Sequence, residues 1–316
     1  MIAIGIDIGG TSIKGASITD QGQILDRFSL DVTKTDLPEK TIGELCDVLN
    51  DFLAKHHYDE PIAGIGIGSP GVIDHEKGEI LSSPNLLTWE HFKLVDFMKA
   101  RVNLPIKINN DANVAALGES IFGSGRDYKN VIMLTLGTGV GSGIILDKKI
   151  YDGHFHQGAE IGHMVIRVNG HPCGCGRRGC LETYASATAL IRDAKLALEK
   201  NPDSLMKEVA QELGKFDARV PFIAEKRGDR TAKRVVRNYV RDLSEGILNI
   251  CNIFRPEVVV LSGGVANEGE NLLRRIRRYL KKYDYGMQHS PYVEVKQAIL
   301  GYDSGKIGAA CLVFDK

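Results

Sequence analysis

The stretch IGIDIGGTSIKGASI at residues 4–18 decides the fold predicted for this chain. It contains an apolar strand (2–8), a glycine-rich turn and a second strand, SIKGASIT (12–19). A second stretch, IMLTLGTGVGSGIIL at 132–146, aligns with the first without gaps and repeats the order of strand, Gly/Thr turn and strand. One such turn is weak evidence, but two of the same construction predict two related domains, each presenting a loop of phosphate size.

The rest of the chain alternates between predicted strands and helices. Buried strands are predicted at 61–71, at 106–111 and in EVVVLSGGVAN (257–267), which ends in glycines. Apolar residues at helical spacing predict helices at 39–56, 186–200, 204–213, 231–253 and 268–282. This alternation favours an α/β architecture.

The domain boundaries follow from the repeat and from the lack of a linker. No low-complexity segment separates the two halves, so we expect packed lobes joined by a hinge and not tethered domains. The N-terminal α/β lobe is expected to comprise residues 1–116 plus 300–316, and the C-terminal α/β lobe residues 117–299.

Length and charge restrict the class of protein. The 316 residues allow two domains, because single hydrophobic cores stop growing near about 250–300 residues. Lys plus Arg and Asp plus Glu number 40 each, and this balance argues against nucleic acid or a membrane as the main partner, because both bind basic surfaces. The basic run RRIRRYLKK (274–282) is interpreted as the solvated face of a helix with four inward-facing residues, Leu272, Leu273, Ile276 and Leu280.

The N-terminus is predicted to be a strand and not a targeting segment. No stretch reaches the ~18–20 apolar residues of a membrane span. The apolar run MIAIGIDIGG (1–10) lacks a basic flank and a cleavage site, and Asp7 interrupts it. We therefore expect a cytoplasmic protein whose thiols stay reduced.

One histidine and three of the six cysteines form the strongest local pattern, H-x₉-C-x-C-x₄-C. Its members are His163, Cys173, Cys175 and Cys180, the last three in CGCGRRGC. Three thiolates and an imidazole are a four-ligand set typical of structural zinc. The alternatives are a disulfide with one odd thiol, or free cysteines. A reducing compartment argues against the disulfide, and three exposed thiols would be prone to oxidation.

The remaining cysteines and the nearby histidines are assigned no ligand role. Cys46, Cys251 and Cys311 lie in apolar contexts and are predicted to be small core residues. His154 and His156, in DGHFHQ, have no matching spacing and are treated as bystanders.

The turn DIGGT (7–11) has residue types suited to a phosphate group. Gly9 and Gly10 allow a tight turn with N–H groups close to an anion, and Thr11 adds a hydroxyl. Asp7 is expected to bind a hydrated Mg²⁺ beside the phosphates, and Lys14 is expected to contribute positive charge.

A second turn, LGTGVGSG (136–143), offers Gly137, Thr138 and Gly139 for the same task. Ordinary β-hairpins also contain Gly-Thr turns, and either turn alone would favour that interpretation. The two matched copies and the SGG loop at 262–264 favour nucleotide binding.

The motif NNDAN (109–113) lies where a predicted strand ends and a helix begins. Phosphoryl transfer to a hydroxyl needs a carboxylate that accepts the proton, and Asp111 is the candidate, with Asn110 fixing a neighbouring hydroxyl. The alternative is structural, because Asp111 or Asn113 would also serve as a helix N-cap. Sequence position alone does not separate the two.

Together these features resemble the ROK family of sugar kinases, from DIGGT to the closing DSGKIGAACLVF (303–314). The most specific stretch is GAEIGH with CGCGRRGCLE, which resembles the sugar- and zinc-binding signature of the family. The resemblance implies a two-domain actin-like (ribonuclease H-like) α/β fold with a ligand cleft between the lobes.

The resemblance also implies the site residues of an ATP-dependent hexose kinase that uses Mg²⁺ and one structural zinc. Asp111 is the implied catalytic base. The implied sugar contacts are Gly71, Asn85, Asn110, Glu160, His163 and Glu182, and His163 is also a zinc ligand. The residues implied for ATP are Asp7, Gly9, Gly10, Thr11, Thr138, Gly139, Gly263 and Gly264.

Functions other than a kinase fit the sequence less well. Repressors of the family carry a DNA-binding winged helix before the core, and here DIGGT begins at residue 7, so we expect no such domain. A non-catalytic sugar sensor would be expected to lack Asp111, and the zinc pattern argues against an actin-like ATPase. Glucose is the first expected substrate, with N-acetylmannosamine next and N-acetylglucosamine, allose and fructose open. The family resemblance also implies a homo-oligomer, a dimer or tetramer.

Overall fold

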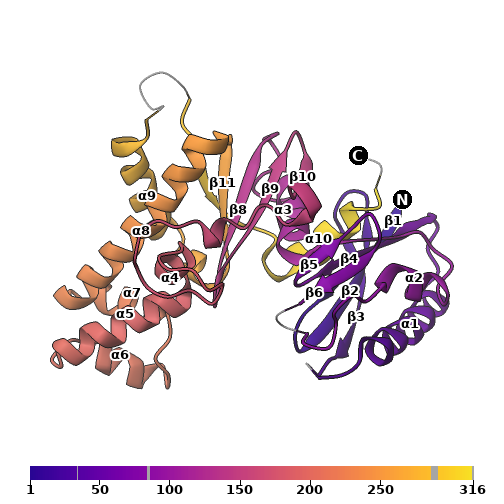
Figure 1. Cartoon of the computed structure of the whole chain (residues 1–316), viewed down its shortest axis with the longest axis horizontal. Coiled ribbons are helices and arrows are strands. Elements are labelled where there is room, and N and C mark those ends of the chain that lie inside the picture. The colour runs from indigo at the N-terminus through magenta and orange to yellow at the C-terminus, as the bar shows by residue number, and fades with distance from the viewer. Residues whose placement is uncertain (34, 84–85, 286–290, 315–316) are drawn as a thin grey trace. The chain divides into compact units, whose positions relative to one another are not determined.

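The computed structural model describes residues 1–33, 35–83, 86–285 and 291–314. Strands and helices alternate along them, which confirms the predicted α/β architecture (Figure 1). The chain forms two compact units. The first comprises Met1–Lys129, Gly143–Ala159 and Ile299–Lys316, and the second Asn130–Ser142 and Glu160–Ala298. This division differs from the lobes expected from the sequence in that residues 117–129, 143–159 and 299 belong to the first unit.

The strands and helices have the following bounds. The strands are β1 (Ile2–Ile8), β2 (Ser12–Thr19), β3 (Ile24–Asp31), β4 (Ile62–Ser69), β5 (Val72–Asp74), β6 (Glu79–Ser82), β7 (Ile106–Asn110), β8 (Val131–Leu136), β9 (Val140–Leu146), β10 (Lys149–Tyr151), β11 (Val258–Ser262) and β12 (Glu294–Gln297). The α-helices are α1 (Pro38–Lys55), α2 (Leu94–Lys99), α3 (Asp111–Ile121), α4 (Glu182–Ala185), α5 (Ala187–Lys200), α6 (Met206–Glu212), α7 (Arg219–Lys226), α8 (Arg230–Phe254), α9 (Glu270–Tyr283) and α10 (Ser304–Cys311). Short 3₁₀ helices are η1 (His154–His156), η2 (Ile161–His163), η3 (Gly264–Glu268) and η4 (Gly301–Asp303).

The first five-stranded sheet has the order β3-β2-β1-β4-β7. Strands β1, β2 and β3 form an antiparallel meander, whereas β4 and β7 run parallel to β1. In this register Asp7 pairs with Gly68, and Gly68 pairs with Asn109. Because parallel strands end at the same edge of a sheet, the residues that follow β1, β4 and β7 gather at one edge.

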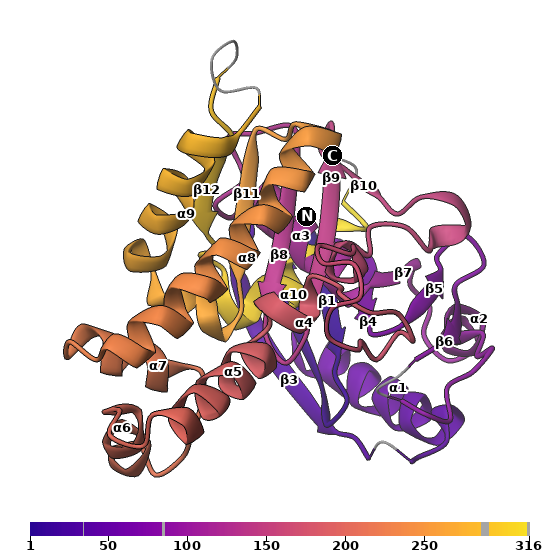
Figure 2. The same cartoon turned by 60° about the vertical axis from the view of Figure 1, so that its left-hand side comes forward.

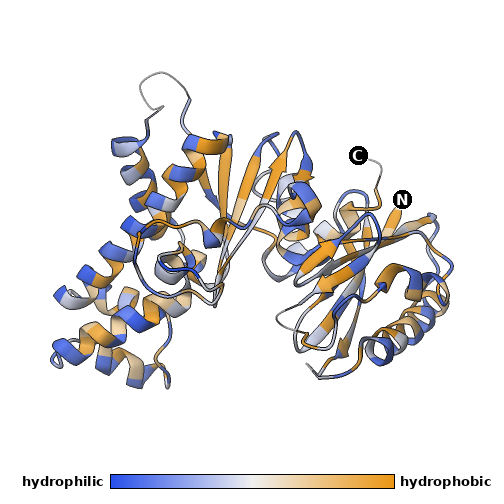
Figure 3. Ribbon diagram, in the orientation of Figure 1, coloured by the Kyte–Doolittle hydropathy of each residue, from blue (hydrophilic) through white to orange (hydrophobic). Residues whose placement is uncertain are grey.

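The second five-stranded sheet repeats this topology with the order β10-β9-β8-β11-β12. Strand β10 is antiparallel to β9, and β11 and β12 run parallel to β8. The repeated topology agrees with the repeat noted between 4–18 and 132–146. Figure 3 shows strands of both sheets in the hydrophobic colour, while the helices carry both colours.

Helix α10 lies directly against the first sheet and against α3 because glycines stand at the contacts. A Cβ atom on Gly66 of β4 would lie 1.7 Å from the carbonyl oxygen of Ala309. A Cβ atom on Gly308 would lie 1.6 Å from the carbonyl oxygen of Val114 in α3. Any side chain at either position would push the two backbones apart.

The long helices of the second unit bury the faces predicted from the sequence. Figure 2 shows α8 and α9 beside the strands β11 and β12. The buried residues of α8 include Val235, Val236, Tyr239, Val240, Leu243, Ile247 and Leu248, and those of α9 are Leu272, Leu273, Ile276 and Leu280. The basic run on α9 is therefore on a helix with an apolar buried side, as predicted. Cys46, Cys251 and Cys311 are buried, which confirms their place in the core.

Among the residues that the structure describes, no helix has both the length and the apolar character needed to cross a membrane.

Candidate active site

Polar residues gather at the carboxyl edge of the first sheet. Asp7 lies near the end of β1, Gly71 follows β4, and Asn110 ends β7. The side-chain Nδ2 of Asn110 donates a hydrogen bond to the carbonyl oxygen of Gly71 at 3.0 Å. Gly71 has φ 107°, and a Cβ atom there would lie 2.1 Å from the carbonyl oxygen of Ser82, so no other residue fits without movement. Backbone groups as well as side chains therefore line the carboxyl edge of the first sheet.

Asp111 begins α3, but the helix cap is Asn110. The Asn110 side-chain oxygen accepts hydrogen bonds from the backbone N–H groups of Ala112 (2.9 Å) and Asn113 (3.3 Å). The alternative that Asp111 or Asn113 is the N-cap is therefore wrong, because the side chain one position earlier already satisfies these donors. Asp111 Oδ1 also accepts from Ala112 N–H at 2.8 Å. The second carboxylate oxygen of Asp111 is not needed for capping.

Charges at this edge influence one another. Burial raises the pKa of Asp111, and hydrogen bonding to the Ala112 N–H opposes the rise without cancelling it. Burial also raises the pKa of Asp7, the Asp111 carboxylate adds to that rise, and the ammonium groups of Lys306 and Lys14 oppose it. The first sheet therefore presents two carboxyl groups whose proton affinity is increased, close to cationic side chains.

The turn after β1 closes on itself. The backbone N–H of Gly9 donates to the carbonyl oxygen of Ser12 at 2.9 Å, so this amide closes the turn and is used within the chain. Thr11 and Lys14 are exposed, and Lys14 pairs with Asp7 across the β1–β2 ladder. A Cβ atom on Gly305 would lie 2.9 Å from Cγ of Asp7, so the first turn of α10 packs against that carboxylate.

In the second unit, two glycine-containing turns lie side by side. Strands β8 and β11 are parallel neighbours, and Ser262 pairs with Thr135 at their carboxyl ends. Gly263 has φ 86°, and a Cβ atom there would lie 2.6 Å from the carbonyl oxygen of Leu136. The turn that contains Thr138 and the SGG loop therefore meet at one edge, and Thr138 and Gly264 are exposed.

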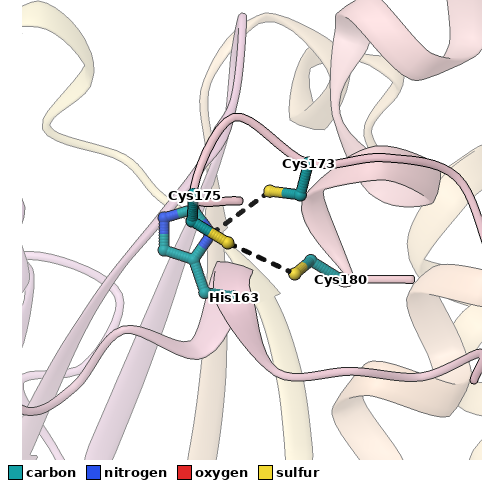
Figure 4. A group of neighbouring side chains, drawn as sticks. All are labelled: His163, Cys173, Cys175 and Cys180. Carbon is teal, nitrogen blue, oxygen red and sulfur yellow. Dashed lines mark hydrogen bonds between the residues drawn. The ribbon is translucent and has the colours of Figure 1, made fainter. Parts of the chain in front are cut away.

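The four residues of the H-x₉-C-x-C-x₄-C pattern come together, and Figure 4 shows their side chains turned toward one another. His163 Nδ1 lies 3.5 Å from Cys173 Sγ, and Cys175 Sγ lies 3.7 Å from Cys180 Sγ. The distance between the two sulfurs is far too long for a disulfide bond, and all four ligand atoms lie within 4.8 Å of one another. The disulfide alternative is wrong for this structure, in which these cysteines are free.

The donor set and its spacing fit a tetrahedral zinc ion. With Zn–S near 2.3 Å and Zn–N near 2.0–2.1 Å, the edges of a tetrahedron are about 3.8 Å between sulfurs and about 3.6 Å between sulfur and nitrogen. The observed separations of 3.7 and 3.5 Å agree with these edges. Burial raises the pKa of Cys173 and Cys180, so these sulfurs carry protons at neutral pH unless a cation replaces them.

Glu182 connects this cluster with the second glycine turn. Its Oε2 accepts a hydrogen bond from the backbone N–H of Val140 at 3.0 Å, and its Oε1 lies 3.8 Å from Cys173 Sγ. A Cβ atom on Gly139 would lie 2.2 Å from Oε2, so the turn is shaped around this carboxylate. Glu160 is exposed, one residue before η2, and its carbonyl oxygen accepts from the His163 N–H at 3.0 Å.

The structure therefore brings the predicted site residues together in two groups, one in each unit. Asp7, Gly71, Asn110 and Asp111 lie at the edge of the first sheet, and Glu160, His163 and Glu182 lie around the cysteine cluster. Asn85 lies outside the described residues.

Sequence reasoning missed two groups of polar residues. Lys306 is 4% exposed, with its ammonium 2.8 Å from Asp303 Oδ1. A lysine directly before the apolar run IGAAC (307–311) was the available signal, since a buried lysine needs an anionic partner. The second group is His75, Asp152 and His156, whose ligand atoms lie within 4.8 Å of one another. We expected His156 to be a bystander, and the structure places its ring beside Asp152, four residues earlier, and beside His75, which is too distant in sequence for the contact to be predicted.

Comparison with known proteins places these residues in a family context. A family model described as the ROK family matches residues 3–316. A protein named glucokinase from Halalkalibacterium halodurans is 37% identical over 312 residues, which cover 98% of this chain and 94% of that protein. A xylose repressor from Caldicellulosiruptor bescii is 31% identical over 285 residues, covering 89% of this chain and 70% of the repressor.

Solved structures give the same result for the fold. The crystal structure of a ROK family glucokinase from Streptomyces griseus, in complex with glucose and AMPPNP, matches with a TM-score of 0.79 at 35% identity. The match covers 99% of both chains.

Proposed function

The chain belongs to the ROK family and has its two-domain actin-like α/β fold, and from this premise we propose that it is an ATP-dependent sugar kinase. The reaction transfers the γ-phosphoryl group of ATP to the 6-hydroxyl of a hexose. Glucose is the first substrate proposed, because full-length relatives at 34–37% identity are named glucokinases. N-acetylmannosamine or another hexose or N-acetylhexosamine is the alternative.

The position of Asp111 carries the proposal. This carboxylate stands at the carboxyl end of β7, where ligands bind in open α/β sheets, and Asn110 already provides the helix cap. A raised pKa makes Asp111 a stronger base than an exposed aspartate. In the proposed step, the 6-hydroxyl oxygen bonds to the γ-phosphorus, the bond from that phosphorus to the β–γ bridging oxygen breaks, and Asp111 takes the hydroxyl proton.

The remaining residues of the first unit orient the reactants. Asn110 is fixed by its bond to Gly71, so we propose that it positions a sugar hydroxyl next to Asp111. Asp7 is proposed to bind hydrated Mg²⁺, which neutralises charge on the phosphates when it is present. The turn residues Gly10 and Thr11 are proposed to contact the phosphates, with Lys14 nearby.

The second unit is proposed to contribute the remaining sugar and nucleotide contacts. Glu160, His163 and Glu182 are the proposed sugar contacts, because carboxylates and imidazoles match the hydroxyls of a pyranose and reject analogues that lack one. Thr138, Gly139, Gly263 and Gly264 are proposed for ATP. Their turns meet at one sheet edge, which supports this assignment.

A structural zinc ion is proposed at His163, Cys173, Cys175 and Cys180. All four positions would be occupied by protein ligands, so the ion would stabilise the loop and not activate water. Since Glu182 contacts both Cys173 and the Val140 N–H, an ordered zinc loop would also fix the second glycine turn. A cytoplasmic location and a homo-oligomer, dimer or tetramer, complete the proposal and rest on the family resemblance.

The test is ADP release with ATP and Mg²⁺ across about ten hexoses and N-acetylhexosamines, at concentrations spanning the ~1 μM–1 mM range of typical KM values. One strong responder, with the sugar 6-phosphate identified by NMR, would establish the kinase and its substrate. Binding of a sugar without ADP release would favour a sensor. If neither ADP release nor sugar binding is detected, the proposed function is rejected.

A further inference from the structure

A second group of possible metal ligands lies in the first unit, apart from the cysteine cluster. His75 follows β5, and Asp152 and His156 lie in the segment after β10. The Nδ1 atoms of both histidines approach the same carboxylate oxygen, Oδ2 of Asp152, at 3.0 Å for His75 and 3.2 Å for His156. The two imidazole rings are 3.9 Å apart between centroids. Two segments about 80 residues apart in sequence thus converge on one oxygen atom.

Hydrogen bonding explains only part of this convergence. The contact from His156 Nδ1 to Asp152 has the geometry of a hydrogen bond, whereas the shorter approach of His75 is an ion-pair contact without that alignment. Zinc bonds of about 2.0–2.2 Å to nitrogen and oxygen give tetrahedral edges of about 3.4 Å, within a few tenths of an ångström of both separations. The side chain of Asp152 is only 14% exposed, so the carboxylate is largely removed from water.

The backbone around His156 adopts a costly conformation. Phe155, His156 and Ala159 have φ values of 53°, 57° and 65°, in the left-handed region that residues other than glycine rarely adopt. The turn directs His156 toward Asp152 and leaves the Phe155 side chain exposed. Apolar burial of Phe155 therefore does not offset the cost, and such strain is commonly found where a ligand is bound.

A further carboxylate lies on the other side of the His156 ring. The other ring nitrogen of His156, Nε2, lies 4.0 Å from Asp74 Oδ1. The ammonium of Lys77 donates a hydrogen bond to Oδ2 of Asp74 at 2.9 Å, which holds this carboxylate in place. If a cation replaced the proton on Nδ1, the ring would carry its proton on Nε2, on the side of Asp74, as in carboxylate–histidine–metal arrangements.

We propose that His75, Asp152 and His156 form a second metal site that binds a divalent transition-metal ion, with zinc the first candidate. Two imidazoles and a carboxylate suit zinc and its neighbours in the series, whereas magnesium and calcium prefer an all-oxygen set. Three protein ligands leave one position for water. Because the chain continues from Ala159 into Glu160, the ion would also stiffen the segment that precedes this proposed sugar contact. That consequence rests on the proposed function, but metal binding does not.

The experiment measures metal binding by the full-length protein in the absence of sugar and nucleotide. The protein is dialysed against a mild chelator until one zinc per chain remains, and Co²⁺ is then titrated while visible absorption is recorded. We expect one further equivalent to bind with cobalt ligand-field bands and without the sulfur-to-cobalt charge transfer that a cysteine site would give. No further equivalent, or bands with thiolate charge transfer, would overturn the proposal.

Three variants locate the site. His75→Ala combined with His156→Ala should weaken Co²⁺ binding by more than the ~10–100-fold typical of losing an outer-shell partner. Asp152→Asn keeps an acceptor oxygen and the side-chain shape but removes the charge, and it should weaken binding at an unchanged melting temperature. His154→Ala, an exposed neighbour outside the cluster, should bind like the unmodified protein. Equal affinity in all four proteins would mean that the cluster is only hydrogen-bonded.

Discussion

Asn110 and Asp111 are adjacent in sequence, and the structure separates their roles. Asn110 caps α3 and contacts Gly71 through the two ends of its amide, so both polar atoms have partners. Asp111 gives one oxygen to the Ala112 N–H and is not required as the cap. At the scale of single residues, the chemistry is therefore expected to depend on the Asp111 carboxylate.

Asp111→Asn tests this dependence. The amide keeps the shape and one acceptor oxygen but does not accept a proton, so kcat should fall by about 10²–10⁴-fold, the usual contribution of a general base. Glucose binding, measured by calorimetry, should stay within a few fold of the original protein. The control is Asp127→Asn at an exposed position, which should leave both quantities unchanged. Near-normal kcat in the Asp111 variant would reject its role as base.

The pH dependence has a defined sign. Burial raises the pKa of Asp111, so the carboxylate takes up a proton above the ordinary aspartate value of about 4, and kcat should fall as the pH drops through this raised pKa. Asp7 titrates beside it with a pKa raised in the same direction, so the acid limb belongs to the pair.

At Asp111 and Asp7 the free energy of unfolding depends on pH in the opposite direction to kcat. A carboxyl group whose pKa is raised on folding binds its proton more tightly in the folded state, so its contribution to the free energy of unfolding grows as the pH falls. Activity should therefore be lost on acidification before the protein unfolds. Parallel measurements of kcat and circular dichroism across the acid range check this order. Coincident loss of both signals would show unfolding and not titration of the site.

At the scale of elements, the site depends on how closely α10 approaches its neighbours. Gly308→Ala would place a methyl group 1.6 Å from the carbonyl oxygen of Val114, so α10 and α3 would have to separate. We expect a loss of about 3 kcal/mol or more in the free energy of unfolding, at the upper end for overpacking. Urea unfolding measures the change.

The matched control for this substitution is Gly43→Ala in α1. A Cβ atom at Gly43 has open space within 4 Å, and the residue lies inside a helix. Alanine should stabilise the protein there by about 0.5–1 kcal/mol, because glycine loses more backbone entropy on folding. Destabilisation of similar size in both variants would mean that the close approach of α10 to α3 does not explain the Gly308 result.

The cysteine loop is the second element whose removal can be tested. Cys175→Ala should abolish the bound zinc, measured by mass spectrometry of the metal content, and should weaken sugar binding through His163 and Glu182. Cys251→Ala is the control, since this cysteine is buried in α8 of the same unit and outside the cluster. The Cys251 variant should keep one equivalent of zinc at the cysteine cluster. Unchanged zinc content in the Cys175 variant would contradict the proposed ligand set.

Prediction from sequence succeeded where the information was local. Strand and helix periodicity predicted β1, β2, β7, α8 and α9, and the spacing of His163 and the three cysteines predicted a cluster. It failed where distant segments meet. The helix α10 is short, and its buried lysine interacts with Asp7 from the other end of the sequence as well as with the nearby Asp303. The cap of α3 could not be chosen either, because Asn110, Asp111 and Asn113 all favour that position.

At the scale of the whole molecule, the two sheets share one topology, yet the proposed contacts differ between the units. The first unit supplies a base and an amide at the end of β7, and the second supplies carboxylates and an imidazole around the cysteine cluster. Asn110 and Asp111 are proposed to orient and deprotonate the acceptor hydroxyl, and the residues around the cysteine cluster are proposed to contact other hydroxyls of the sugar. The proposed assignment therefore requires that sugar binding affects both groups of residues.

Hydrogen–deuterium exchange tests this requirement. Glucose alone should slow exchange both in NNDAN (109–113) and in the segment 160–182, by up to about 100-fold at 100 times Kd wherever opening needs release of the sugar. A nonhydrolysable ATP analogue alone should instead protect the turns at 7–11, 137–139 and 262–264. A sugar that the enzyme does not phosphorylate is the control and should protect neither set. Protection by glucose of only one of its two segments would mean that the other unit does not bind the sugar, and its assigned contacts would then be wrong.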